Sequence, residues 1–183
     1  IKNVEGEVVK TIYWENDKPS DFNWNGTNQE NNQVLDGVYN YSITATDKAG
    51  NTSLPASITN IIYSAEKPST NIFIEGSKYF SPNTESSINS VTFDLIIPVP
   101  EEKTGNKLVE WNVFIQDSSS KTVRTFNSAK DGELPPEKIV FDGLDDNSNL
   151  LPDGEYQAFV TAKYLNGFEP AKISSPKIIL DTE

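Results

Sequence analysis

The sequence contains neither histidine nor cysteine among its 183 residues. Histidine is the most common general base near neutral pH, and cysteine supplies thiolate nucleophiles, disulfides and soft metal ligands. Histidine- and thiol-based catalysis, disulfide cross-links and thiolate metal sites are therefore excluded. A glycine-rich phosphate-binding loop is also absent. Paired carboxylates can hydrolyse glycosides, but the acidic residues here cluster in turn-forming stretches, so we predict that the chain is not an enzyme.

Long hydrophobic runs and positive charge are scarce as well. No apolar run approaches the roughly 20 residues that a membrane-spanning helix needs, so we expect no transmembrane segment. The chain has 15 basic and 27 acidic residues, which gives a net charge of −12. An acidic surface repels phosphate backbones, and nucleic acid is therefore not an expected partner.

The sequence does contain an internal repeat. The stretch from Trp24 to Glu66 recurs without a gap at an offset of 117 residues and ends at Glu183. The aligned pairs include Trp24 with Phe141, Gly26 with Gly143, Asp36-Gly37 with Asp153-Gly154, Tyr39 with Tyr156, and Gly50 with Gly167. An ungapped self-match of this kind indicates a repeated module. We predict two domains, a partial module at 1–66 and a complete one at 67–183.

The repeated segments have the patterns of β-strands separated by turns. In Gly37–Asp47, apolar and polar residues alternate strictly, as in a sheet with one buried face. The other strands predicted in the first module are Glu7–Trp14, Asp21–Asn25 and Ser57–Tyr63, with a turn at Asn16–Ser20. Those predicted in the second are Asn71–Glu75, Ser90–Ile97, Val109–Asp117, Lys121–Phe126, Lys138–Phe141, Gly154–Tyr164 and Pro176–Leu180. Seven short strands in such a segment are typical of an immunoglobulin-like sandwich.

The predicted fold class is therefore all-β, with two tandem immunoglobulin-like or fibronectin-III-like β-sandwich modules and almost no helix. Alternation also predicts which side chains form the core. We expect these residues to be buried: Tyr39, Ile43, Ala45, Trp111, Val113, Tyr156, Val160 and Ala162. We expect these not to be buried: Asn40, Thr44 and Gln157. A register shift of one residue would invert all of these assignments.

The first module lacks the N-terminal strands of the second. Val9–Ile12 aligns with Val123–Phe126, so residues 1–66 contain no counterpart of the first three strands predicted for the second module. Without those strands, Gly37–Asp47 would expose an apolar face and an unpaired edge. We therefore expect something to cover this face. The candidates are a second copy of the chain, a separate chain, and the second module.

Three segments of the first module resemble a known domain family. Trp24-Asn-Gly26, Leu35–Tyr39 and Ala45–Asn51 resemble the FlgD-type immunoglobulin-like domain of flagellar hook-cap proteins, a domain type that recurs in bacterial envelope and surface proteins. The second module keeps Phe141-Asp-Gly143 and Pro152–Tyr156, but it lacks the later Asp and Asn.

This resemblance implies an extracytoplasmic location, in the periplasm or at the bacterial cell surface. The absence of catalytic residue types and the tandem modules lead us to predict a non-catalytic structural, spacer or interaction role within a larger protein, with neighbouring modules of the same chain or a second copy as protein partners. The alternatives are an adhesin-like module that binds glycan or protein, and an accessory module of a surface enzyme.

The shared Asp-Gly-x-Tyr motif has a physical interpretation. Gly37 and Gly154 can adopt positive φ where a loop enters a strand. Asp36 and Asp153 can accept hydrogen bonds from the backbone of that turn. The following tyrosine begins the buried face, much like a tyrosine corner. We therefore interpret this motif as structural.

Two candidate sites remain. Asp142, Asp145, Asp146 and Asp153 place hard oxygen ligands in and beside one loop, which suits calcium as the one possible cofactor. The equivalent loop of the first module carries mostly amides, so a solvated acidic loop is the alternative. Trp14 has no aromatic counterpart in the second module. It is either a partly exposed contact residue for a ligand or a packing residue specific to its module.

Overall fold

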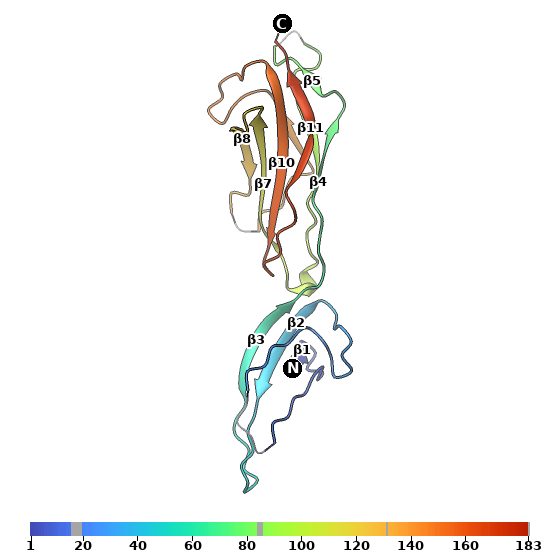
Figure 1. Cartoon of the computed structure of the whole chain (residues 1–183), viewed down its shortest axis with the longest axis vertical. Coiled ribbons are helices and arrows are strands. Elements are labelled where there is room, and N and C mark those ends of the chain that lie inside the picture. The colour runs from blue at the N-terminus through green and yellow to red at the C-terminus, as the bar shows by residue number, and fades with distance from the viewer. Residues whose placement is uncertain (16–19, 84–85, 131, 183) are drawn as a thin grey trace. The chain divides into compact units, whose positions relative to one another are not determined.

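The computed structural model describes residues 1–15, 20–83, 86–130 and 132–182. The chain divides into two compact units (Figure 1). Unit 1 comprises Ile1–Glu66 and Glu101–Asn106, and unit 2 comprises Lys67–Pro100 and Lys107–Glu183. Unit 1 thus includes a short segment that lies within the predicted second module. Most of the turn predicted at Asn16–Ser20 falls outside the described residues.

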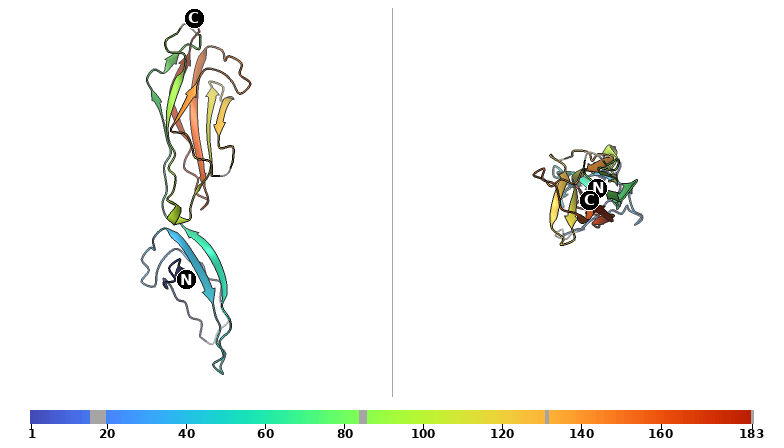
Figure 2. Two further views of the ribbon diagram at one scale, coloured as in Figure 1. Left: turned by 180° about the vertical axis from the view of Figure 1, so that it is seen from behind. Right: turned by 90° about the horizontal axis from the view of Figure 1, so that it is seen from above.

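Unit 2 is built from two sheets that pack face to face (Figures 1 and 2). One sheet has the order β4-β6-β9, with β4 at Asn71–Glu75, β6 at Val91–Ile96 and β9 at Lys138–Phe141. The other has the order β5-β11-β10-β7-β8. Its strands are β5 (Tyr79–Phe80), β7 (Leu108–Asp117), β8 (Thr122–Asn127), β10 (Gly154–Tyr164) and β11 (Ile173–Leu180).

The strand order identifies unit 2 as an immunoglobulin-like sandwich. When the short strand β5 is set aside, the first, second and fifth strands form one sheet, and the third, sixth and seventh strands are adjacent in the other. All seven strands predicted for this module are present, with ends shifted by up to three residues. The pairing of β5, parallel to β11, was not predicted. Two residues are too few to show an alternating pattern.

Alternating residues of both sheets form the core of unit 2. Val113, Ile115, Ala158 and Val160 have no exposed surface, and Trp111 is only 5 % exposed. The indole Nε1 of Trp111 donates a hydrogen bond of 2.9 Å to the carbonyl of Glu133. These positions, with Tyr156 and Ala162, confirm the predicted register of this module, and Gln157 is not buried.

Unit 1 contains a single three-stranded sheet of order β1-β2-β3. Its strands are β1 (Lys2–Asn3), β2 (Gly37–Ile43) and β3 (Ala56–Tyr63). The strands predicted at Glu7–Trp14 and Asp21–Asn25 are not formed, and β2 ends before Ala45. The reason is that the described part of unit 1 provides no neighbouring strand for these segments. In unit 2, the counterparts of these segments pair with β7 and β6, and a strand needs a neighbour to satisfy its backbone groups.

The same lack of partners leaves unit 1 without a full core. Tyr39 is its single buried hydrophobic residue among those described, and its ring packs against Trp24 and Tyr63. The predicted burial of Ile43 and Ala45 is wrong, because Ile43 is half-buried and Ala45 is exposed. Thr44 is exposed and Asn40 is half-buried, so neither is part of the core.

The expectation of almost no helix agrees with the structure. The described residues contain one 3-10 turn, η1 at Glu102–Thr104, and no α-helix. η1 lies in the segment that belongs to unit 1, where Gly105 approaches Val38 and Ile62 so closely that an added Cβ would clash with Val38. No helix within the described ranges has the length and hydrophobicity needed to cross a membrane.

Candidate functional site

Among the residues that the structure describes, six hairpin loops share one backbone pattern. In each, the first residue accepts a hydrogen bond from the N–H of the fourth, which has positive φ. In five of these loops the first residue is Asn or Asp, and its Oδ1 accepts the N–H groups of the third and fifth residues. These five residues are Asn3, Asn28, Asp47, Asp117 and Asp145. The loops therefore use side-chain oxygens as structural acceptors.

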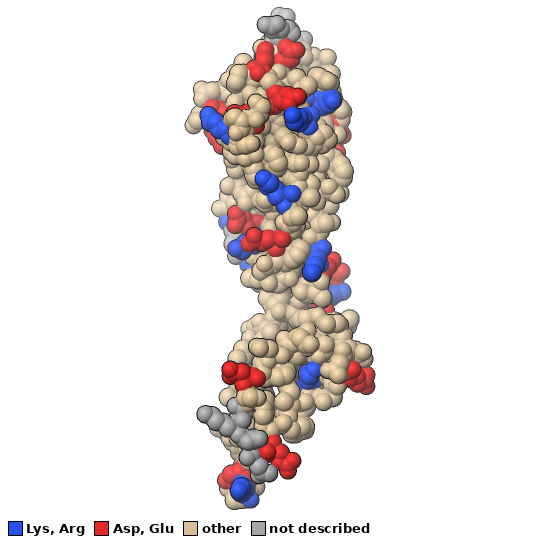
Figure 3. All heavy atoms as spheres, in the orientation of Figure 1, with Lys and Arg blue, Asp and Glu red and all other residues tan. Residues whose placement is uncertain are grey.

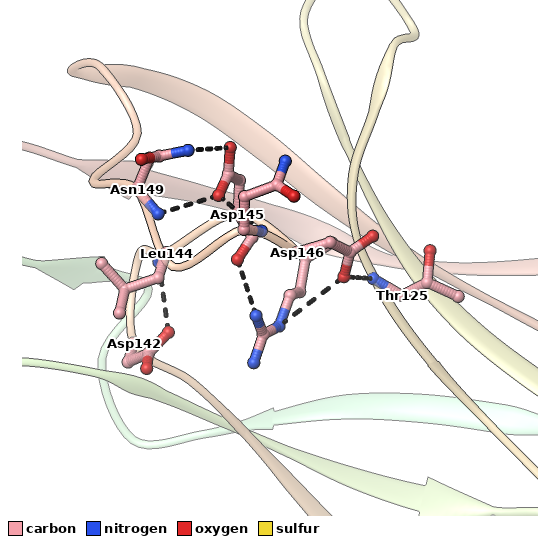
Figure 4. A network of polar contacts seen from close by, with 8 residues as sticks. Thr125, Asp142, Leu144, Asp145, Asp146 and Asn149 are labelled. Atoms are coloured by element: carbon pink, nitrogen blue, oxygen red, sulfur yellow. Dashed lines mark hydrogen bonds and ion pairs between the residues drawn. The ribbon is translucent and has the colours of Figure 1, made fainter. Parts of the chain in front are cut away.

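Asp145, one of the four predicted calcium ligands, has this role. Its Oδ1 accepts the N–H groups of Asn147 and Asn149, each at 2.8 Å, and its Oδ2 accepts the side-chain amide of Asn149 at 3.2 Å (Figure 4). The hydrogen bonds from Asn149, first from its backbone and then from its side chain, hold the pKa of Asp145 below its usual value. The carboxylate is thus stabilised by its own loop.

The other three aspartates face different partners. Asp146 Oδ1 accepts the N–H of Thr125 at 2.9 Å and lies 4.0 Å from Nε of Arg124 (Figure 4). Asp142 accepts the N–H of Leu144 at 3.1 Å. Asp153 accepts both the N–H and the hydroxyl of Thr182.

These carboxylates hold segments of the chain in place rather than converging on a common point. Within the described ranges, no three or more Asp or Glu side chains form a group that could hold a metal ion. Calcium binding by the four aspartates stays a prediction, with a structural role for each as the alternative.

Trp14, the predicted contact residue, is half-buried. Its indole Nε1 donates to Oγ of Ser20 at 3.3 Å, and the neighbouring Tyr13 is almost fully exposed. Two adjacent aromatic residues with accessible surface are compatible with ligand contact, which also stays a prediction.

The repeat is reproduced in hydrogen bonds as well as in sequence. The hydroxyls of Tyr39 and Tyr156 each donate to a carbonyl four residues earlier at 2.6 Å, forming the predicted tyrosine corners. Asp36 and Asp153 accept backbone N–H groups at equivalent positions after the last strand of each module. The two aspartates therefore hold the residues that follow the last strand of each module. The prediction that they accept hydrogen bonds from the turn in which they lie is wrong.

Asp36 is partly buried, which by itself raises its pKa. The hydrogen bonds from Ala65, Ser64 and Glu66 outweigh this effect and lower the pKa of Asp36 below its ordinary value. The prediction of positive φ at the following glycine is confirmed for Gly154, at 159°, and wrong for Gly37. Each strand begins at the glycine itself.

The N-terminal residues extend the repeat further, at an offset of 114. The N–H of Gln29 donates to the carbonyl of Val9 at 3.0 Å. The equivalent hydrogen bond in unit 2 runs from the N–H of Asp146 to the carbonyl of Val123 at 3.1 Å. The Asn3 loop likewise matches the Asp117 loop. β1 is therefore the counterpart of the end of β7. The prediction that residues 1–66 contain no part of the third strand is wrong, because its last residues are present.

The edge of β2 is the clearest difference between the two modules. β10 pairs with β7 along its whole length, from Tyr156 to Tyr164. β2 pairs with β1 only at Tyr39 and Asn40. In the part of the chain that the structure describes, the rest of β2 has no strand beside it on this side. This edge and the face next to it distinguish β2 from β10.

A second surface feature was not predicted from the sequence. Phe114 and Phe159, which lie opposite each other in β7 and β10, stack on the outer face of the five-stranded sheet with ring centroids 5.5 Å apart. Nζ of Lys172 lies 4.6 Å from the ring centroid of Phe159 and 5.8 Å from that of Phe114. The signal in the sequence is a Phe at an otherwise polar position of each strand, between Asn112 and Gln116 in β7.

The first part of the chain is similar to a known domain family. Residues 1–49 match the family model of the FlgD Ig-like domain. This match confirms the resemblance carried by Trp24–Gly26, Leu35–Tyr39 and the start of Ala45–Asn51. The comparison with curated proteins gives no match.

Several solved structures are similar to this chain at low identity. Dimeric latent PorU from Porphyromonas gingivalis has 15 % identity and a TM-score of 0.44, with 82 % of this chain and 13 % of that chain covered. Titin module A71 from human cardiac muscle has 18 % identity and a TM-score of 0.37, with 63 % and 92 % covered. The fibronectin(III)-like modules of Clostridium thermocellum CbhA have 13 % identity and a TM-score of 0.35, with 81 % and 64 % covered.

Proposed function

We propose that this chain is a non-catalytic structural module of a larger bacterial envelope or surface protein, and that it spaces or docks neighbouring parts of that protein. The observation that carries the proposal is the use of the repeated polar residues. Asp36, Asp153 and the Asx residues of five loops accept hydrogen bonds from the backbone of their own module. These residues stabilise the fold, so few polar residues of the repeated sequence remain that could act in catalysis.

The surface supports the same proposal. Acidic and basic side chains are interspersed on the visible face of unit 2 (Figure 3), a distribution that favours solubility over binding of one highly charged ligand. The FlgD Ig-like match at residues 1–49 is the basis for proposing an extracytoplasmic location. Neighbouring modules of the same protein are the proposed partners.

A replacement experiment tests the spacer role. In the complete protein, residues 67–183 are exchanged for an unrelated β-sandwich of similar length or for a flexible Gly/Ser linker. A spacer role predicts that the sandwich preserves the surface display and the activity of the flanking regions, whereas the linker does not. If the unrelated sandwich abolishes that activity, the module has a specific binding or accessory role and the spacer proposal is wrong.

A second candidate function is ligand binding, and the stacked pair Phe114 and Phe159 is the observation that favours it. Flat aromatic surfaces beside polar strand residues can contact glycans or proteins. A glycan array probed with the parent chain, Phe159→Ala and Trp14→Ala distinguishes the two aromatic sites. Binding lost in Phe159→Ala and kept in Trp14→Ala would place the ligand on the five-stranded sheet. The reverse result would support Trp14.

A further inference from the structure

Strand β8 forms one edge of the five-stranded sheet in unit 2. In the described part of the chain β7 is its one strand partner, so the N–H and C=O groups of alternate β8 residues point away from the sheet. Such an edge can add a strand from another molecule, which leads to aggregation. Two of the outward groups, the carbonyl of Val123 and the N–H of Thr125, are bound by a single residue that lies in a turn.

This residue, Asp146, takes the place of a strand partner. Its N–H donates to the carbonyl of Val123 at 3.1 Å, and its Oδ1 accepts the N–H of Thr125 at 2.9 Å (Figure 4). In a parallel ladder, a residue of the neighbouring strand donates to the residue before its partner and accepts from the residue after it. Asp146 makes this pair of contacts around Arg124, with a side-chain oxygen in the position of a backbone carbonyl.

Gln29 makes the same pair of contacts in unit 1. Its N–H donates to the carbonyl of Val9 at 3.0 Å, and its side-chain Oε1 accepts the N–H of Thr11 at 2.9 Å. Gln29 aligns with Asp146 at the offset of 117. One acceptor is a neutral amide, and the other is a carboxylate on a shorter side chain. The arrangement therefore requires an oxygen acceptor at this place and not a negative charge.

Further contacts hold the loop of Asp146 against the edge of β8. Nη1 of Arg124 donates to the carbonyl of Asp145 at 2.6 Å, and Asp145 accepts backbone N–H groups of its own loop. β8 also has one residue more than β7 at this point, Val123, which lies between the paired residues on either side. Such a bulge disturbs the regular ladder that an incoming strand would need.

We propose that Asp146 and Gln29 are edge guards, residues that block the addition of a strand from a second copy of this chain. An incoming strand needs the carbonyl and N–H groups that these residues already bind. Similar modules within one chain increase this hazard, because like modules can misassemble or exchange strands. The guard occupies the edge without an additional strand. This role goes beyond the proposed spacer function and does not depend on it.

Asp146→Ala in the full chain tests the guard, because it removes Oδ1 and keeps the backbone N–H. At low protein concentration, we expect the Thr125 amide to exchange with solvent about tenfold faster than in the parent. At high concentration, we expect self-association about tenfold tighter than that of the parent, with the Thr125 amide protected again. Hydrogen exchange by NMR and sedimentation equilibrium are the readouts, and the amides of β10 are the internal reference.

Two control variants separate edge pairing from other effects. Asp146→Asn keeps an oxygen acceptor, as Gln29 does in unit 1, and we expect it to behave like the parent. Thr125→Pro in the Asp146→Ala background removes the N–H that an added strand would use. Proline is tolerated at an edge position whose N–H faces away from the ladder. We expect this double variant to associate no more strongly than the parent.

Three results would overturn the proposal. They are Asp146→Ala with association no stronger than that of the parent, Asp146→Ala with unchanged exchange at Thr125, and equal association of Asp146→Ala and Asp146→Asn. Gln29→Ala compared with Gln29→Glu repeats the test in unit 1, with the Thr11 amide as the readout. This second pair decides the outcome if near-ultraviolet circular dichroism shows that Asp146→Ala does not fold.

Discussion

Asn28 and Asp145 occupy the same position in the two repeats and accept the same pair of backbone N–H groups. One side chain is neutral and the other is charged, so the loop requires an oxygen acceptor and not a negative charge. This comparison explains how the acidic loop of the second module can fold like the amide-rich loop of the first. It also separates the structural role of Asp145 from a calcium role, because the charge of a ligand affects calcium affinity but is not needed to accept backbone N–H groups.

The substitution Asp145→Asn tests this at different pH values. Hydrogen bonds depress the pKa of Asp145 in the folded state below 3.8. A carboxylate with a depressed pKa stabilises the fold above its unfolded pKa, and that contribution is lost as the pH falls through the folded pKa. We expect any Tm advantage of the parent over Asp145→Asn at pH 7 to shrink below pH 3.8. Melting curves followed by circular dichroism measure it, and a gap independent of pH would contradict the assignment.

The effect of calcium on the Tm tests the alternative role of the four aspartates as calcium ligands. If the four aspartates serve only as backbone acceptors, millimolar calcium leaves the Tm of the parent unchanged relative to EDTA. A calcium-dependent rise in Tm that is lost in Asp145→Asn would show a bound ion, because a ligand that binds only the folded state stabilises it by mass action.

The tyrosine corner gives a third prediction at this scale. Tyr156→Phe removes the hydroxyl that donates to the carbonyl of Pro152 and keeps the ring in the core. We expect a loss of about 1 kcal/mol in the free energy of unfolding, the net value of one hydrogen bond. Urea denaturation measures this loss, and Glu155→Gln, at an exposed position of the same strand, is the control. A variant as stable as the parent would show that the hydroxyl contributes nothing.

At the scale of elements, equivalent strands differ in what covers them. β10 lies between β7 and β11 and faces the sheet β4-β6-β9, so its inward side chains are buried. In unit 1, the described residues form no such opposing sheet over β2. The same alternating pattern therefore produces a core in one module and an accessible face in the other.

Paired substitutions at equivalent positions measure this difference. Val160→Ala should reduce the free energy of unfolding of unit 2 by about 2 kcal/mol, because it removes two buried methyl groups and leaves a cavity. Ile43→Ala removes more carbon, yet we expect a smaller loss in unit 1 because the side chain already contacts water. Denaturant titrations measure the loss in free energy of unfolding for each variant. Equal losses would mean that the β2 face is covered in solution.

Trp111 is the largest buried side chain of β7. Its ring is 5 % exposed and its Nε1 has a carbonyl acceptor, so Trp111→Ala creates a cavity and leaves the carbonyl of Glu133 without this donor. We expect a loss of about 3–5 kcal/mol. No disulfide can compensate, because the chain contains no cysteine. A Tm within a few degrees of the parent would show that the ring is peripheral to stability.

At the scale of the whole molecule, the buried apolar residues are divided unequally. The hydrophobic cluster lies in unit 2, whereas Tyr39 is the one buried hydrophobic residue described in unit 1. Stability of a domain depends mainly on the apolar surface that it buries. We expect two unfolding transitions, with unit 1 the less stable. Calorimetry of the chain and of residues 67–183 alone tests this expectation, and a single two-state transition would contradict it.

The sequence by itself determined the features that depend on local patterns. The period of two in Val109–Asp117 and Gly154–Tyr164 predicted the strands and the buried side of each, and the repeat predicted the common framework of Tyr39 and Tyr156. Turn residues predicted where strands end. These signals are local because side-chain alternation and turn conformations are set by neighbouring residues.

Tertiary structure decided everything that depends on partners distant in the chain. Glu7–Trp14 has a strand-like composition but forms no strand, and Ala45 continues an alternating pattern but stays exposed, because the described residues form no neighbouring sheet that pairs with or covers them. The stacking of Phe114 on Phe159 likewise required the register of β7 on β10. Burial and backbone pairing are properties of a pair of segments, so one segment of sequence cannot fix them.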